Sequence, residues 1–173
     1  PLSRAAYVGV SGLSRIPALR SALLGSPAAG IAELARTHAA LDRLGTLPQV
    51  VVAAIDGDAL AGGCELALAC DLRVMVQGEG RIGLVEVSAA IPPGAGGTQR
   101  LARAVGPARA RSMMLRATTL DAVSAYDLGL VDEVVPLDDL ERRVMEQAQR
   151  MAKHAPLTMA AMKEAARRQT ETF

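Results

Sequence analysis

The apolar residues of this chain fall into segments of two kinds, one with helical spacing and one typical of buried strands. Residues 31–47 carry apolar side chains at helical spacing, and Gly45 and Pro48 mark the end, which predicts a helix. Residues 50–55 form a short, continuously apolar and mostly β-branched run, which predicts a strand buried on both faces. Residues 1–30 hold no period for long, so the pattern assigns no element there.

Strands and helices alternate through the rest of the chain. Residues 61–70 begin with glycines and continue with good helix formers, which predicts a glycine-rich loop that opens a buried helix. Prolines and glycines exclude regular structure from residues 92–97. Further strands are predicted at 72–76, 81–84 and 131–135, and further helices at 98–105, 108–115, 121–128, 137–152 and 157–168. This alternation predicts an α/β domain with a substantial parallel component.

Composition narrows the class of partner. With 173 residues, half of them hydrophobic, the chain can form one soluble domain with a sizeable core. Its 19 basic and 18 acidic residues nearly cancel, so no strong field draws it to nucleic acid or to an anionic membrane. We also find no signal peptide and no uncharged apolar run of spanning length. We therefore expect no nucleic-acid or membrane partner and a cytoplasmic location.

The cysteines and histidines do not form a metal or redox motif. Cys64 and Cys70 have neither the spacing of a redox pair nor that of zinc ligands, and His38 and His154 are remote from them in sequence. Cysteine commonly packs as a small apolar residue. We expect two buried free thiols and no metal site.

Gly62 and Gly63 form a candidate oxyanion hole. Neither has a Cβ, and their place before a helix leaves amide donors pointing outward, which would suit a thioester oxygen that becomes enolate-like. A tight turn that only packs a helix against a strand explains the two glycines at least as well, because short glycine motifs are common.

Two acids follow this loop. Glu65 lies in the first turn of an otherwise apolar helix, and Glu86 lies before the proline-glycine segment. Each alone is explained by a structural role, Glu65 by the helix dipole at an exposed edge and Glu86 by ordinary solvation. If the fold brings both into one apolar pocket, one can act as a base and the other as an acid, which suits the addition of water to a double bond.

Other catalytic arrangements find little support. The chain has no Gly-x-Ser-x-Gly elbow, and Ser88 and Ser124 have no histidine nearby in sequence. The glycines of residues 94–97 are not followed by Lys-Ser or Lys-Thr, which argues against a P-loop, and no dinucleotide-binding glycine pattern follows residues 50–55.

Four segments together resemble the crotonase (enoyl-CoA hydratase/isomerase) family. Residues 51–73, VVAAIDGDALAGGCELALACDLR, are similar to the signature that runs from a buried strand to the catalytic helix. Residues 83–87 (GLVEV), 93–101 (PGAGGTQRL) and 121–135 (DAVSAYDLGLVDEVV) resemble later segments in the same order. The likeness covers roughly residues 48–168, and ordered motifs are more specific than any one of them.

The resemblance implies a fold and a domain organisation. The fold would be α/β, a crotonase-like ββα spiral with C-terminal helices. Residues 1–135 would form the spiral core, with an incomplete N-terminal part, and residues 136–173 a truncated C-terminal helical region. Family members of this kind assemble as homotrimers or dimers of trimers.

The resemblance also implies an activity, the hydration of a 2-enoyl-CoA without a metal or redox cofactor, coenzyme A being part of the substrate. Gly62 would supply one oxyanion N–H, Glu65 and Glu86 would hold the water and exchange its protons, and the N–H of Gly94 would help to place that water. Related isomerases rely chiefly on the second acid, so an enoyl-CoA isomerase is the enzymatic alternative. A catalytically silent subunit is the alternative from another class.

Several positions depart from the family pattern. Val85 stands where proline is usual, one extra residue separates the two acids, and residues 90–92 replace a glycine-containing turn. Ser11-Gly12 is too short a likeness to identify the second oxyanion donor. Arg100 and Asp71 are assigned to structural ion pairs and not to catalysis.

Overall fold

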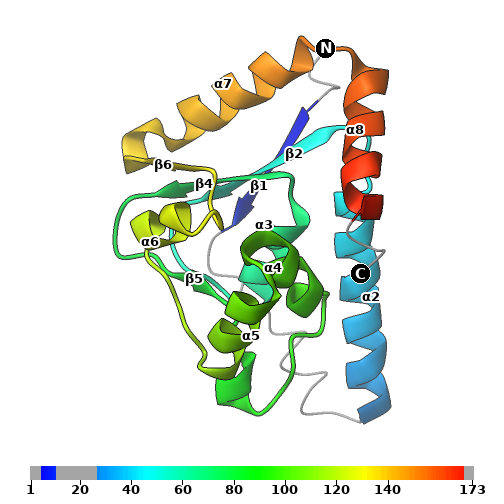
Figure 1. Cartoon of the computed structure of the whole chain (residues 1–173), viewed down its shortest axis with the longest axis vertical. Coiled ribbons are helices and arrows are strands. Elements are labelled where there is room, and N and C mark those ends of the chain that lie inside the picture. Colours follow the sequence, from blue (N-terminus) through cyan, green and yellow to red (C-terminus); the bar gives the residue numbers. More distant parts are fainter. Residues whose placement is uncertain (1–4, 11–26, 170–173) are drawn as a thin grey trace.

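The structure is a computed structural model that describes residues 5–10 and 27–169. A parallel sheet with strand order β1-β2-β4-β6 forms its centre (Figure 1). Its strands are β1 (Ala5–Val10), β2 (Val50–Ile55), β4 (Leu72–Val76) and β6 (Glu133–Val135). All three neighbouring pairs are parallel, with Val52 opposite Leu72 and Val74 opposite Glu133. The predicted parallel α/β organisation is confirmed.

Helices and a small second sheet complete the described part. β3 (Ala59–Leu60) and β5 (Ile82–Gly83) pair in parallel, and Ile82 also bridges to Leu120. The helices are α2 (Pro27–Gly45), α3 (Gly62–Ala69), α4 (Gly97–Val105), α5 (Pro107–Leu115), α6 (Ala122–Asp127), α7 (Leu140–Ala152) and α8 (Pro156–Gln169), and two 3₁₀ turns are η2 (Glu86–Ala89) and η3 (Leu137–Asp139).

The main sheet is covered on both faces, which explains the continuously apolar sequence of β2. Its alternate residues Val50 and Val52 pack in a cluster with Val144 of α7. The intervening positions Val51, Ala53 and Ile55 belong to a second cluster, to which α3, α4, α5 and α6 contribute. Figure 1 shows α7 on one side of the sheet and α3, α4 and α5 on the other. A strand in this position needs apolar side chains at every residue.

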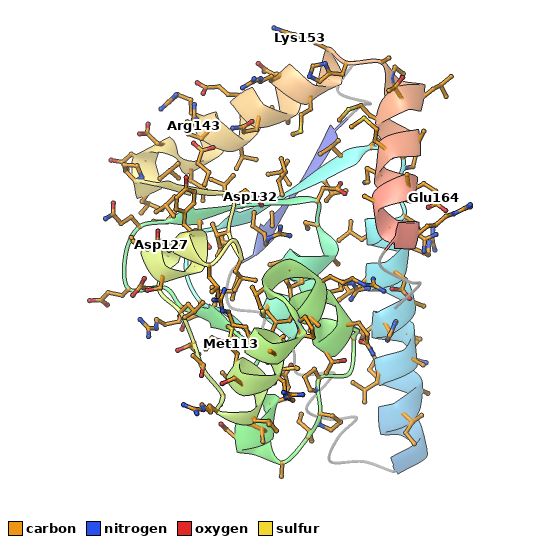
Figure 2. All side chains as sticks on the ribbon, viewed as in Figure 1. Met113, Asp127, Asp132, Arg143, Lys153 and Glu164 are labelled. Atoms are coloured by element: carbon orange, nitrogen blue, oxygen red, sulfur yellow. The ribbon has the colours of Figure 1, made fainter. Side chains whose placement is uncertain are left out.

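Ion pairs tie the outer elements to the sheet. Figure 2 shows Arg143 on α7 beside β6, where its Nε donates to Oε1 of Glu133 at 2.7 Å. Lys163 of α8 donates to the Asp71 carboxylate just before β4 and to the Gln49 carbonyl just before β2, both at 2.6 Å. The assignment of Asp71 to a structural ion pair is confirmed.

Several predicted boundaries were wrong, and each has a local cause. The pattern missed β1, because a six-residue strand in a mixed Gly/Ala/Val sequence carries no period of its own and is defined by its pairing with β2. The helix predicted from residue 31 begins at Pro27, and the strand predicted from 131 begins at Glu133. The helix predicted from 137 starts with the 3₁₀ turn η3 and becomes α-helical at Leu140.

Candidate functional site

Glu65 is buried at the start of α3. Only 4% of its surface is exposed, which rules out the simple reading of an acid at an exposed helix edge. Its Oε1 accepts two backbone hydrogen bonds, from the N–H of Ala95 at 2.7 Å and from the N–H of Gly97 at 2.9 Å. One carboxyl oxygen can accept two hydrogen bonds because it has two lone pairs. Glu65 is therefore held by the loop that precedes α4.

Glu86 is also buried, but its carboxylate is held differently. It opens η2 with 6% of its surface exposed, and neither of its carboxylate oxygens has a hydrogen-bond partner in the described part of the chain. Burial raises the pKa of Glu86 above its ordinary value, and the nearby Glu65 charge raises it further. The N–H groups of Glu86 and Val85 lie close enough to offset part of this shift without forming a hydrogen bond to the carboxylate. An ordinary solvated acid is excluded here as well.

The fold thus brings together two acids from separate segments. The charge of Glu65 acts on Glu86, and Cys64 lies near both acids. Burial is the main cause that raises the pKa of the Cys64 thiol, and the charges of Glu86 and then Glu65 raise it further. All three side chains are buried. Two carboxyl groups that share an apolar setting can divide acid and base roles between them.

An apolar cavity of about 390 Å³ adjoins Glu86. Three large hydrophobic side chains on its wall, Val87, Ile91 and Leu115, remain exposed, which leaves room for an apolar guest. The other residues that line it are Leu84, Glu86, Pro92, Pro93, Thr98, Arg111 and Met114. Glu86 is therefore one of the residues that line the cavity, whereas Glu65 is bound to the loop beside it.

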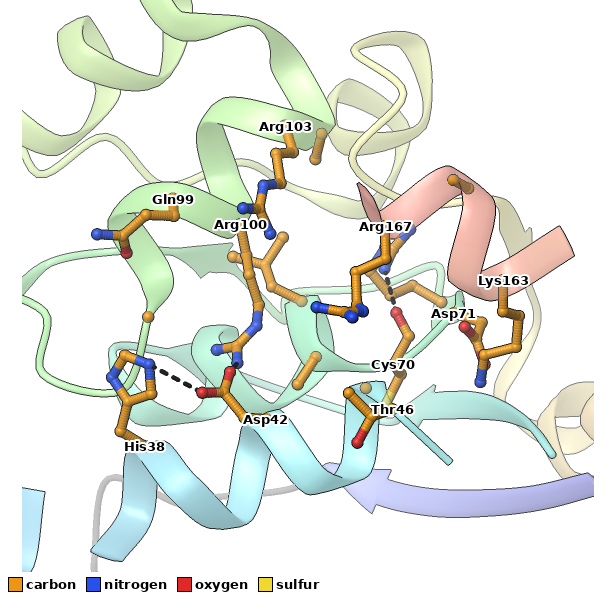
Figure 3. A pocket seen from close by; sticks show the side chains of 17 residues that line it. His38, Asp42, Thr46, Cys70, Asp71, Gln99, Arg100, Arg103, Lys163 and Arg167 are labelled. Carbon is orange, nitrogen blue, oxygen red and sulfur yellow. Dashed lines mark hydrogen bonds and ion pairs between the residues drawn. The ribbon is translucent and has the colours of Figure 1, made fainter. Parts of the chain in front are cut away.

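A larger cavity of about 750 Å³ lies elsewhere, between α2, α4 and α8 (Figure 3). Polar and basic side chains line it, including those of Arg73, Arg100, Arg103 and Lys163. Neither Glu65 nor Glu86 reaches it. Although this cavity is larger, it is not the candidate site, because neither of the two neighbouring acids lines it.

The candidate oxyanion donor opens α3. Gly62 is the first helical residue, so its N–H has no acceptor within the helix. Apart from its chain neighbours and the adjacent helix backbone, no atom lies within 4 Å of the position a Cβ would take. The preceding Ala61 has φ 51° and ψ −121°, a conformation that costs a non-glycine residue about 1–3 kcal/mol. Hydrogen bonds from the Ala61 N–H to Gly83 and from the Glu65 N–H to Ala61 hold it there. Such strain is typical of functional sites.

The proline-glycine loop contributes two hydrogen-bond donors that the sequence analysis did not name. A Cβ on Gly94 would lie 2.4 Å from Leu34 Cδ2, so this glycine packs closely against α2. Among the described residues, the loop donors to Glu65 are Ala95 and Gly97, which sequence reasoning missed. The signal that could have found Gly97 is its place in a glycine-rich loop. The role of Gly94 toward water stays a prediction, and Ser11-Gly12 lies outside the described residues.

The described residues 5–10 and 27–169 form neither a metal-binding cluster nor a membrane-spanning helix. That part holds no group of three or more His, Cys, Asp or Glu side chains placed to bind a metal ion. It also holds no helix long and apolar enough to cross a membrane. Cys64 and Cys70 are buried free thiols, as predicted.

Comparison with known proteins identifies the family. The sequence model described as enoyl-CoA hydratase/isomerase matches residues 31–173. The chain is 46% identical over 123 residues to an enoyl-CoA isomerase/hydratase of Mycosarcoma maydis, covering 71% of this chain and 45% of that protein. It is 45% identical over 130 residues to the 2,3-dehydroadipyl-CoA hydratase of Escherichia coli (strain K12), covering 75% and 50% respectively.

The fold agrees with a solved structure. An enoyl-CoA hydratase from Bacillus anthracis aligns with a TM-score of 0.83 at 33% identity, covering 94% of this chain and 64% of that one. The chain spans about half the length of the curated relatives it matches. The predicted crotonase-like α/β fold with C-terminal helices is confirmed, and the chain belongs to the enoyl-CoA hydratase/isomerase family.

Proposed function

We propose that this chain hydrates 2-enoyl-CoA thioesters, and that Glu65 and Glu86 carry the reaction. The observation that carries the proposal is the unpaired, buried carboxyl group of Glu86, a residue that lines an apolar cavity, beside a second buried acid. An unpaired buried carboxyl group costs free energy and is retained where it has a use. A group that must exchange a proton with a bound substrate has such a use.

The two environments assign the roles. Glu86, whose pKa is raised, is the acid and protonates C2 of the enoyl group. Glu65, which accepts two N–H bonds, is the base and takes a proton from the water whose oxygen bonds to C3. The N–H of Gly62 stabilises the negative charge that develops on the thioester oxygen. A proton shift from Glu65 back to Glu86 completes the cycle, so one water is added and both acids return to their starting forms.

This reaction needs no oxidant or reductant, and we propose that it uses no metal or redox cofactor. The acyl chain would occupy the cavity beside Glu86, because its exposed Val87, Ile91 and Leu115 would exclude water from the double bond. From the family likeness we also propose a homotrimer or dimer of trimers in the cytoplasm, with acyl-CoA as the small-molecule partner.

A direct assay tests the proposal. The purified chain is mixed with crotonyl-CoA, and the loss of enone absorbance is followed. We expect Glu65→Gln and Glu86→Gln each to lose at least about 10²-fold in kcat while binding of butyryl-CoA stays near wild type. Glu79→Gln, at an exposed turn, is the matched control. Absence of turnover by the wild type would reject the hydratase and favour a silent subunit, and full activity in either acid variant would reject that residue's role.

Isomerisation is the second candidate, favoured because Glu86 lines the cavity and Glu65 does not. Moving a double bond from C3 to C2 requires removal and return of one proton, which a single carboxyl group can perform. With 3-hexenoyl-CoA as substrate, an isomerase would produce the conjugated enone, and the Glu65→Gln variant would retain that activity. A hydratase would lose its activity in the same variant.

A further inference from the structure

Arg100 lies between the helix α2 and the loop that holds Glu65. Its side chain is 13% exposed, and its Nη2 donates to Oδ1 of Asp42 on α2 at 2.6 Å. Its Nη1 donates to the backbone carbonyl of Ala95. Figure 3 shows the guanidinium of Arg100 pointing from α4 toward Asp42. The expected structural ion pair is confirmed, and the same guanidinium also binds the loop through the Ala95 carbonyl.

Through Ala95, this second contact connects Arg100 to the Glu65 carboxylate. The carbonyl of Ala95 accepts from Arg100, while the N–H of the same residue donates to Glu65 Oε1 at 2.7 Å. Gly96 follows with φ +88°, and a Cβ there would lie 2.6 Å from Arg100 Nη1. The loop therefore lies directly on the guanidinium, and its next residue, Gly97, supplies the second N–H to Glu65.

The other end of the contact is fixed to α2. The Asp42 carboxylate also contacts His38 Nε2 at 3.2 Å, one turn earlier in the same helix. The Ala95 side chain packs in a small buried cluster with Leu41 of α2 and Ala69 of α3. Three helices thus meet at this loop, and its amide directions depend on where Arg100 holds the Ala95 carbonyl.

We propose that Arg100, anchored by Asp42, is a positioning residue that aims the N–H groups of Ala95 and Gly97 at the catalytic carboxylate of Glu65. The inference rests on the proposed function only in taking Glu65 as the base. A guanidinium can hold the Asp42 carboxylate and the Ala95 carbonyl at once because its donors are fixed in one plane. A lysine ammonium lacks this fixed fork and replaces it only in part.

Kinetics test whether Arg100 acts through Glu65. We expect Arg100→Met to lower kcat about 10- to 100-fold with KM within about threefold, since a small displacement of a catalytic group has that effect. Arg100→Lys should recover part of the loss. Arg103→Met is the control, because Arg103 lies on the same helix and lines the same cavity. The double variant Glu65→Gln/Arg100→Met should be no slower than Glu65→Gln alone.

A multiplicative loss in the double variant would overturn the inference, because damage unrelated to Glu65 would add to its removal. Wild-type kcat in Arg100→Met would overturn it as well. Equal losses in Arg100→Met and Arg103→Met would show a general effect of surface charge, with the same consequence.

A second measurement does not depend on turnover. The backbone amide protons of Ala95 and Gly97, which donate to a carboxylate, are followed by ¹H–¹⁵N NMR. Both signals should move upfield in Glu65→Gln and in Arg100→Met, and stay in place in Arg103→Met. Unchanged signals in Arg100→Met would refute the inference even if the enzyme hydrates crotonyl-CoA. If the signals move but the wild type has no hydratase activity, the proposed reaction fails and the positioning by Arg100 stands.

Discussion

Gly97 lies so close to Glu65 that a single methyl group would displace the carboxylate. A Cβ at this position would lie 2.8 Å from Glu65 Cγ, 2.9 Å from Glu65 Oε1 and 3.0 Å from Leu84 Cδ2. Carbon atoms in contact prefer about 3.5–4.0 Å, so these neighbours must move by about 0.5–1 Å. Leu84 is fully buried and the Glu65 side chain is fixed at one oxygen, so neither can move without loss.

The Gly97→Ala change therefore affects activity more than stability. Overpacking a buried site costs about 1–3 kcal/mol. Gly97 begins α4 with ordinary helical backbone, where alanine is preferred over glycine by about 0.5–1 kcal/mol, which offsets part of this cost. The net destabilisation should be roughly 0–2.5 kcal/mol. Displacing the Glu65 carboxylate by up to about 1 Å should lower kcat by about 10²-fold.

Two assays separate these effects. The free energy of unfolding is measured by urea titration, and kcat is measured with crotonyl-CoA on the folded protein. Gly78→Ala is the matched control, because no atom lies within 4 Å of a Cβ at that position. A Gly97→Ala variant with wild-type kcat would show that the position of the Glu65 carboxylate does not limit the reaction, and the reasoning would be wrong.

Three further predictions concern stability and reactivity. Because burial raises the pKa of Glu86 above 4.5, the folded state holds this proton more tightly than the unfolded state, and stability from this group falls as pH rises through the folded pKa. Glu86→Gln should match the wild type near about pH 4 and exceed it by roughly 1–3 kcal/mol near about pH 8 in urea titrations; equal curves at both pH values would contradict this. Leu101→Ala empties a fully buried site and should cost about 2–5 kcal/mol by the same titration, so a loss under about 1 kcal/mol would show that the core closes around it. Burial raises the pKa of Cys64, and that of Cys70 to about 12, so a disulfide reagent at neutral pH should modify both thiols only after urea unfolding; rapid reaction of the native chain would refute their burial.

Some elements of the fold could be predicted because their signal is local. The apolar run of β2 is bounded by Pro48 and the Asp56-Gly57 turn, and the structure has this strand at Val50–Ile55 as expected. The break at Gly106-Pro107 separates α4 from α5, since proline fits the first turn of a helix. β1 carried no such signal, because only hydrogen bonding to β2 makes a strand of that segment.

The residue types at the site were also visible in the sequence, whereas their arrangement was not. Glu65 stood out as an acid in an apolar helix, and both acids could be named from their segments. Tertiary structure alone decided that Glu86 lines a cavity with its carboxylate unpaired, while the Glu65 carboxylate accepts hydrogen bonds from Ala95 and Gly97. Backbone donors carry no residue type, and burial depends on how distant segments pack, so neither leaves a local trace in the chain. The physical difference between the two acids is therefore a property of the fold, and the sequence determined only which groups the fold would bring together.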